Sequence, residues 1–400
     1  MNRYTFILCF LLWSLSCSTE QPKEAPGINY LGQELPDRIP KIFGKGIVSV
    51  EGRFDLGFTL SSDGKSMAFG VAHESNPEET CIYLMRNANG KWTSPDRSFL
   101  PGNINTFFPM FSPSGDELYF VKSVGDAATD LWVAKYHDHR TIEPQPMDSI
   151  FNSSSREAGH GLSRNGLFYF TSNRDDQYQC CGDIYHTQLE SGTYSAVQKS
   201  EVLSSEADEE SLFLSPNEDF IIIQSWRSEF ASKHDLYVSY RTKDGSWTPP
   251  DRLDTLINSK EIEQRPFVSP DNQFLFFSRT SVTQKNGQEV YDSDIYWVST
   301  HSVFRPYIYN TQMEASVKYN EIFQLTFPQD VFKDVDQEQL TFKLSLEDGS
   351  EIPEWMSFDA EKLRLSGKWN TKGAIHLKLT ATDVYENSAE FSFELSEKSH

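Results

Sequence analysis

EADEESLFLSPNEDFIIIQSWRSEFASKHDLYV, the stretch at residues 206–238, decides the fold of this chain. It places a four-residue turn, SPNE at 215–218, between two apolar runs, and a further short strand begins at Asp235. Ser, Pro and Asn between two apolar runs are typical of a tight turn that joins antiparallel strands. The stretch therefore predicts three consecutive strands.

The same turn occurs five times, at spacings of 51, 51, 52 and 54 residues. The copies read SSDG at 61–64, SPSG at 112–115, SRNG at 163–166, SPNE at 215–218 and SPDN at 269–272. A third strand recurs after each copy, as CIY at 81–83, DLW at 130–132, DIY at 183–185, DLY at 235–237 and DIY at 294–296. A fourth strand follows a polar turn after copies one to four. Four antiparallel strands per period of about 50 residues describe a propeller blade.

The fifth copy lacks an obvious fourth strand, and residues 41–48 align with the fourth-strand segments of the other copies. We expect this N-terminal strand to close the ring, which removes free sheet edges. The sequence thus predicts an all-β, five-bladed β-propeller over residues 41–300. A ring with a sixth, degenerate blade stays open as the alternative.

These repeats resemble the WD40-like repeats of TolB-type propellers, and the resemblance covers roughly residues 42–300. It implies a scaffolding role in the bacterial cell envelope. The turn departs from the family pattern at Glu218, where Gly is usual, and the third strand departs at Cys81, where Asp is usual. The repeat is a strong indicator of fold and a weak one of function.

Beyond an expected linker at residues 301–318 the repeat ends and strands with period-two alternation begin, as FQLTF at 323–327 and IHLKL at 375–379. The alternation predicts a small β-sandwich over residues 319–397. Motifs such as DVD at 334–336 and TATD at 380–383 resemble the dystroglycan-type, cadherin-like family of bacterial Ig-like domains. By that analogy Asp334, Asp336 and Asp383 are calcium-ligand candidates, and carboxylates suit Ca²⁺. The alternative, which we favour, is that these aspartates cap turns; no other cofactor is expected.

The N-terminus reads as an export signal, because Arg3 precedes an apolar run at residues 4–15 that is too short to span a bilayer. Cys17 follows, and the segment resembles a bacterial lipoprotein signal (residues 1–17) in which Cys17 receives the lipid. An ordinary cleaved signal is the alternative. Residues 18–40 are expected to be a tether, and the protein an outer-membrane lipoprotein that faces the periplasm or the surface.

The formal net charge of −22 and the absence of Lys/Arg clusters argue against binding to nucleic acid, and against membrane contact except through the lipid. Cys81, Cys180 and Cys181 form an odd set that does not suit a disulfide framework. The adjacent Cys180 and Cys181 are interpreted as two thiols, with a vicinal disulfide as the alternative.

Acidic residues recur six positions before the turn serine in four copies, with Thr106 at the remaining one. These candidate binding residues are Asp55, Glu157, Glu209 and Glu263, with Arg265 as a partly neutralising neighbour. Fivefold symmetry predicts that they surround one mouth of the channel, where they would attract a cation or a polyhydroxy ligand. The alternative is that they bond to backbone N–H groups and solvate loop ends.

The function predicted is that of a monomeric binding or scaffolding protein that recognises an envelope protein or a glycan, without catalysis. A carbohydrate-active enzyme, either a glycoside hydrolase or a lyase that uses two carboxylates, is the runner-up. A purely structural spacer is the third hypothesis, and a channel filled by side chains would favour it.

Overall fold

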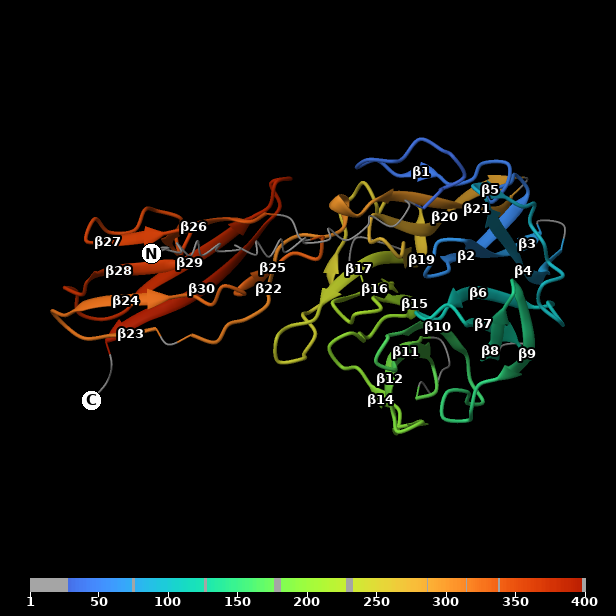
Figure 1. The fold of residues 1–400 in the computed structure, drawn as a ribbon, viewed down its shortest axis with the longest axis horizontal. Helices are drawn as coiled ribbons and strands as arrows, with labels where there is room; N and C mark the ends of the chain where they lie inside the picture. Colours follow the sequence, from blue (N-terminus) through green and yellow to red (C-terminus); the bar gives the residue numbers. More distant parts are fainter. Residues whose placement is uncertain are drawn as a thin grey trace, which may run out of the picture.

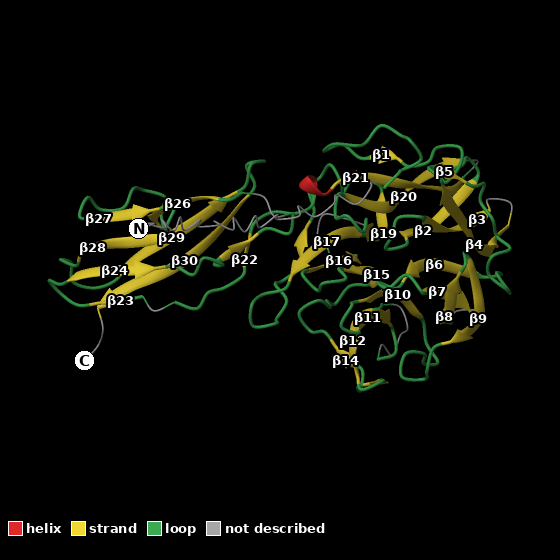
Figure 2. Ribbon diagram, viewed as in Figure 1, coloured by secondary structure: helices red, strands yellow, loops and turns green. Residues whose placement is uncertain are grey.

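The computed structural model describes residues 28–73, 76–125, 128–175, 181–227, 233–285, 287–313, 315–336 and 339–397. Two β-domains follow one another along the chain, a ring of small sheets (right in Figure 1) and an elongated sandwich (left). Figure 2 shows that strands and loops make up nearly all of both, with one short 3-10 turn, η1 (Thr300–Ser302). The predicted all-β class, a propeller followed by a small sandwich, is confirmed.

Antiparallel pairing arranges the propeller strands in sets that follow the chain order, and the first and last sets join into one eight-stranded sheet where Phe54 pairs in parallel with Ser293. The first set is β2 (Arg53–Leu60), β3 (Ser66–His73), β4 (Asn76–Ala88) and β5 (Lys91–Trp92); the second is β6 (Thr106–Phe111), β7 (Glu117–Ser123), β8 (Thr129–His137) and β9 (Arg140–Pro146); the third is β10 (Glu157–Leu162), β11 (Leu167–Ser172), β12 (Asp183–Glu190), β13 (Thr193–Tyr194) and β14 (Gln198–Lys199); the fourth is β15 (Glu209–Leu214), β16 (Phe220–Ser225), β17 (Asp235–Tyr240) and β18 (Asp251–Arg252); the fifth is β19 (Ile262–Val268), β20 (Phe274–Lys285), β21 (Gln288–Ser299) and β1 (Lys41–Ile42).

The first strand of each set lines the centre, since β2, β6, β10, β15 and β19 contact one another in that order and β19 returns to β2. The N-terminal strand β1 supplies the outer strand of the fifth blade, with Lys41 opposite Trp297 in β21. The predicted closure of the ring by an N-terminal strand is therefore confirmed. The pairing thus joins the two ends of the repeat region.

The recurring turn serine stabilises the hairpin that it begins. Its hydroxyl accepts the backbone N–H of the second strand, over 2.9 Å at Ser61, 2.9 Å at Ser215 and 3.0 Å at Ser269. Each bond satisfies a backbone donor where the ladder has not yet begun. The strict recurrence of serine thus has a structural cause.

The expected tether is wrong from residue 28 onward. Tyr30 is buried, and its ring lies 5.0 Å from the ring of Phe274 and 5.5 Å from that of Trp297. Asn29 accepts a 2.7 Å hydrogen bond from Trp92 Nε1 through its carbonyl. Burial of the Tyr30 side chain against the blade that closes the propeller is favourable, because it removes apolar surface from water. The segment therefore belongs to the propeller.

The sandwich consists of three small sheets. Their strands are β22 (Tyr307–Ile308) with β25 (Phe332–Lys333); β23 (Ser316–Val317), β30 (Ser388–Glu397), β29 (Ile375–Thr382) and β26 (Thr341–Leu346); and β24 (Ile322–Thr326), β28 (Arg364–Lys368) and β27 (Met356–Asp359). Trp369, Leu365 and Leu379 are fully buried between them.

The expected linker at 301–318 is also wrong, because it supplies strands β22 and β23 to the sandwich. Phe304 and Tyr307 from the same segment are buried against the propeller, where the Tyr307 ring stacks on Tyr240 at 4.4 Å. The aromatic residues Phe304 and Tyr307 were the sequence signal that this segment packs against a domain, since a linker exposed to solvent does not bury aromatic rings.

Several expectations fall on residues outside the described ranges, among them the signal, the lipidation site Cys17 and Cys180. Cys181 takes part in a disulfide, so the interpretation as a thiol is wrong at this position. Cys81 is a free, buried thiol, and burial raises its pKa. Across the described residues, no helix has the length and apolar character needed to cross a bilayer.

Candidate binding site at the channel mouth

The four recurring carboxylates are inside the blades rather than around the channel mouth. Asp55, Glu157, Glu209 and Glu263 have no exposed surface. The predicted carboxylate ring at the mouth is therefore wrong. Neighbouring residues in a strand point to opposite faces, and none of these four side chains lines the cavities of the channel.

Blade four shows what holds such a carboxylate. Glu209 accepts hydrogen bonds from the Ser205 hydroxyl at 2.6 Å and from the Ser225 hydroxyl at 2.7 Å. Arg227 Nη2 lies 2.9 Å from the same carboxylate, and its guanidinium carbon lies 5.3 Å from the ring centroid of Tyr237. We call this set of Glu, upstream Ser and downstream Arg the carboxylate latch.

The latch recurs in blades three and five. In blade three Glu157 bonds to the Ser153 hydroxyl at 2.6 Å, and Arg174 lies 3.5 Å away. In blade five Glu263 bonds to the Ser259 hydroxyl at 2.7 Å and to Arg279 Nε at 2.8 Å. Burial raises the pKa of Glu263, while Ser259 and Arg279 act in the opposite direction.

Blades one and two carry altered latches. In blade one Arg53 Nη2 lies 3.9 Å from Asp55, whose pKa is raised well above the usual range by burial, with Arg53 opposing the shift. In blade two the Thr106 hydroxyl donates to Asn103 at 2.6 Å, so no charge is buried there.

The latch had a sequence signal that the prediction missed. A serine stands four residues before Glu157, Glu209 and Glu263, and arginine follows the serine at the end of the second strand, as SNR at 172–174, SWR at 225–227 and SR at 278–279. A carboxylate that recurs together with its own cation and hydroxyl is a structural unit, because burying it alone would be costly.

The channel is instead lined by the residues one and two positions after each carboxylate. Every innermost strand carries a β-bulge there, between Asp55 and Phe58 in β2 and between Gln264 and Phe267 in β19 for example. A bulge re-aims side chains and ends regular pairing. Gly57, Phe108 and Arg265 adopt positive φ at this level, of 93°, 50° and 54°.

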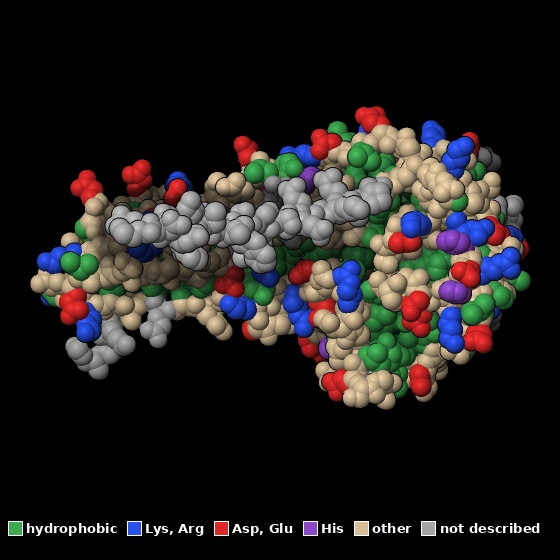
Figure 3. Space-filling view, in the orientation of Figure 1, with side chains coloured by type: hydrophobic (Ala, Val, Ile, Leu, Met, Phe, Trp, Pro, Cys, Tyr) green, Lys and Arg blue, Asp and Glu red, His purple; other side chains and the backbone are tan. Residues whose placement is uncertain are grey.

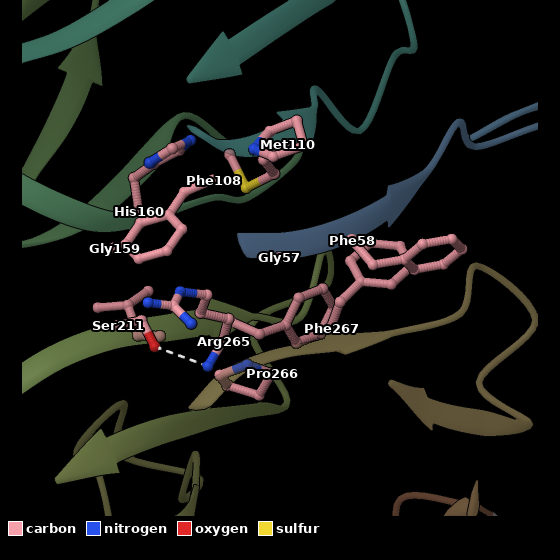
Figure 4. A pocket seen from close by; sticks show the side chains of 13 residues that line it. Gly57, Phe58, Phe108, Met110, Gly159, His160, Ser211, Arg265, Pro266 and Phe267 are labelled. Carbon is pink, nitrogen blue, oxygen red and sulfur yellow. Dashed lines mark hydrogen bonds between the residues drawn. The ribbon is translucent and has the colours of Figure 1, made fainter. Parts of the chain in front are cut away.

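A cavity of about 580 Å³ opens at this end of the channel. Its wall is mainly apolar and aromatic, with Phe54, Leu56, Phe107, Phe108 and Ala158 from the inner strands. The volume is in the range of sites that hold small molecules or single side chains of a partner. A second, smaller cavity of about 40 Å³ is lined by Gly57, Phe108, Gly159, Ser211 and Arg265. Figure 4 shows these residues.

One predicted binding residue, Arg265, does lie at the site. Its guanidinium carbon is 4.5 Å from the ring centroid of Phe108 and 5.9 Å from that of Phe54. Nη1 donates to Gln264 Oε1 at 2.8 Å, whereas Nε is buried without an acceptor. Desolvation lowers the pKa of Arg265 to about 10, and the charge of Glu210 opposes this.

The charged side of the cavity comes from blades three and four. Arg156 contacts Asp208 at 2.9 Å and Glu210 at 3.4 Å, and Gln224 donates to Glu210 at 2.7 Å. Burial opposes the lowering of the Asp208 pKa, but His234 and Arg156 outweigh it. The cavity thus joins an apolar wall to a fixed polar one.

A long hairpin forms part of the rim. Strands β20 and β21 pair as far as Lys285 and Gln288, and Glu289, Val290 and Tyr291 line the cavity. Tyr291 is 49% exposed, and its hydroxyl donates to Glu289 at 2.6 Å. The hairpin presents an exposed aromatic ring where a ligand would enter.

The three aspartates predicted as calcium-ligand candidates differ in their surroundings. Asp383 accepts backbone N–H bonds from Tyr385 and Asn387, both at 2.8 Å, and so caps its own turn. Asp334 has two buried oxygens without donors, and burial together with Asp336 and Asp383 raises its pKa. Within the described residues, no three His, Cys, Asp or Glu side chains are placed to hold a metal ion.

Charged side chains of both signs are interspersed over the propeller face seen in Figure 3.

Comparison with known proteins identifies the second domain. Residues 305–396 match the family described as Putative Ig domain. The C-terminal unit is an Ig-like domain. This confirms the predicted class, and the match begins within the segment that had been expected to be a linker. No curated protein matches the chain.

Solved structures similar to the chain include propellers of several kinds. TolB from Acinetobacter baumannii is 15% identical, with a TM-score of 0.37, over 62% of this chain and 55% of that one, so the match spans little more than half of TolB. The β-propeller domain of the Trilobed protease from Pyrococcus furiosus is 11% identical, with a TM-score of 0.30, over 88% and 100%. The NanB sialidase from Streptococcus pneumoniae is 13% identical, with a TM-score of 0.34, over 55% and 35%. One fold can host many unrelated functions, so function has to be argued from the site itself.

Proposed function

We propose that the protein is a lipid-anchored binding protein of the bacterial cell envelope, which recognises a protein or glycan partner through the cavity at its channel mouth. The cavity of about 580 Å³ carries the proposal, because it joins aromatic walls to a few fixed charges in the way that binding sites do. The apolar run and Cys17 at the N-terminus support the anchor. An open cavity is not what a purely structural spacer requires.

The experiment is capture of partners from envelope extract by the mature chain, residues 18–400. Tyr291→Ala removes an exposed ring from the rim, and we expect it to weaken capture about tenfold. The matched control is Leu189→Ala, which removes a 39% exposed apolar side chain from β12, outside this cavity. Capture that is equal in wild type and Tyr291→Ala would contradict recognition at the mouth.

The glycan-enzyme alternative would use the carboxylates that line the cavity, Glu210 and Glu289. Both are engaged, Glu210 with Gln224 and Arg156 and Glu289 with Tyr291. Turnover of a glycan by wild type that is lost in Glu210→Gln would replace the binding proposal with an enzymatic one.

The lipid anchor has its own test. If Cys17 receives the lipid, processing of the N-terminus should be sensitive to globomycin, and Cys17→Ser should abolish this sensitivity.

A further inference from the structure

Arg265 is a cation without a counter-charge at the floor of the cavity. No ion pair to it exists in the part of the chain that the structure describes, and its Nε is buried with no acceptor. Figure 4 shows its side chain reaching across the channel, between the Phe108 ring and Ser211. Every latch arginine, by contrast, faces a carboxylate.

Glu210 acts on Arg265 through its charge, but other groups hold its carboxylate. Glu210, the acidic group that acts on it, is bonded to Gln224 at 2.7 Å and to Arg156 at 3.4 Å. A guanidinium held between aromatic rings with a free N–H favours an incoming anion, since charge-assisted hydrogen bonds in a dry site are strong. The cation is also fixed in place, because Arg265 sits in a bulge whose backbone N–H bonds to the Ser211 hydroxyl at 3.1 Å.

The rest of the cavity limits the charge of the ligand. Glu210 and Glu289 line the same space, so a phosphate ester or another polyanion would meet carboxylates as well as Arg265 and Arg156. Phe54, Leu56, Phe107 and Ala158 offer no polar partner to the remainder of a ligand. The complement of this cavity is an apolar or aromatic body that ends in one negative charge.

We propose that the channel mouth binds a small amphipathic monocarboxylate, whose carboxylate pairs with Arg265 and whose apolar body fills the space between Phe54, Phe107 and Tyr291. This assignment rests on the proposed function, because it names the ligand class of the same cavity. The aromatic rings around the carboxylate exclude water and strengthen its pairing with the guanidinium.

Calorimetric titration of residues 18–400 with 4-phenylbutyrate and with 4-phenyl-1-butanol tests the proposal, because the two probes share a body and differ in charge. We expect the acid to bind at least about tenfold more tightly than the alcohol. Arg265→Met should reduce acid binding to about the level of alcohol binding. Arg164→Met, at the opposite end of the channel, is the matched control and should bind the acid as wild type does.

Equal affinity for acid and alcohol, or no binding of the acid up to about 10 mM, would overturn the proposal. So would an Arg265→Met protein that binds the acid as wild type does. The acid and alcohol comparison on wild type decides the matter even where a variant fails to fold. The capture experiment separates the two proposals. If Tyr291-dependent capture is seen but the acid and the alcohol bind alike, only the assignment of a carboxylate ligand is wrong. If Tyr291-dependent capture is not seen either, the proposed function is also wrong.

Discussion

Glu209 and Glu210 are consecutive residues of one strand, yet they belong to two regions with opposite roles. Glu209 is enclosed in the blade-four latch, and Glu210 faces the channel cavity. The pleat alone separates them, because successive side chains in a strand point to opposite faces. The recurring carboxylate holds blades together, and the non-recurring one beside it shapes a site.

Two arginines differ in the same way as these two glutamates. Arg227 bonds to Glu209, lies over Tyr237 and donates to the Leu203 carbonyl in the loop that leads from the preceding blade. Arg265 has aromatic neighbours too, but no ion pair among the described residues. The arginines of the latches are thus paired with carboxylates, whereas the charge at the cavity floor is left for a ligand to pair with.

The largest effect should follow from breaking a latch. Arg227→Met leaves the Glu209 carboxylate buried without its cation, and we expect unfolding to become easier by about 3–5 kcal/mol. Chemical denaturation monitored by tryptophan fluorescence measures this. The double variant Arg227→Met/Glu209→Gln removes both charges and should recover part of the loss; no recovery would mean that the arginine acts through packing alone.

A somewhat smaller loss of stability should follow from forcing two innermost strands of the propeller apart. A Cβ at Gly159 would lie 2.2 Å from Ser211 Cα and 2.8 Å from the Glu210 carbonyl oxygen, so Gly159→Ala forces β10 and β15 apart. We expect a loss of about 1–3 kcal/mol. Gly125→Ala is the control, because a Cβ there meets nothing within 4 Å. Equal stability of the two variants would show that the inner strands are less tightly packed than described.

The sandwich contains the same contrast between satisfied and unsatisfied charge. Asp383 is capped by its own turn, whereas Asp334 has no donor, and burial next to Asp336 and Asp383 raises the Asp334 pKa to about 8. A folded-state pKa above the unfolded value means that this group stabilises the fold most at acid pH and loses that effect as pH rises toward 8. The groups around it are Asp336, Asp383 and, through Asp336, His301.

Thermal melts between pH 5 and pH 8 should therefore show a falling melting temperature in wild type and a flatter profile in Asp334→Asn. Asp348→Asn, on an exposed turn, should follow wild type. Parallel profiles for Asp334→Asn and wild type would remove Asp334 as the cause.

The fold could be predicted because short local patterns indicate it. These patterns are a turn and strand that repeat five times and the alternation of the C-terminal strands. The site could not be predicted fully. The recurrence of Asp55, Glu157, Glu209 and Glu263 was visible, but which face they occupy depends on bulges that no local pattern marks. Arg265 was predicted only as a neutralising neighbour of these carboxylates, although it lines the cavity that they do not reach. The rim residue Tyr291 lay in a hairpin extension that the repeat did not cover.

The smallest stability effect should come from Arg265 itself. Arg265→Met removes a desolvated, unpaired guanidinium and keeps an unbranched side chain between Phe108 and Phe54, so we expect stability within about 1 kcal/mol of wild type, or above it. The same denaturation experiment that finds a large loss in Arg227→Met measures this. A loss of similar size in Arg265→Met would show that its charge is needed by the fold and would remove the contrast between the two arginines. A neutral or stabilising outcome, combined with lost binding of a carboxylate, would mean that the propeller keeps this charge for its ligand at some expense to its own stability.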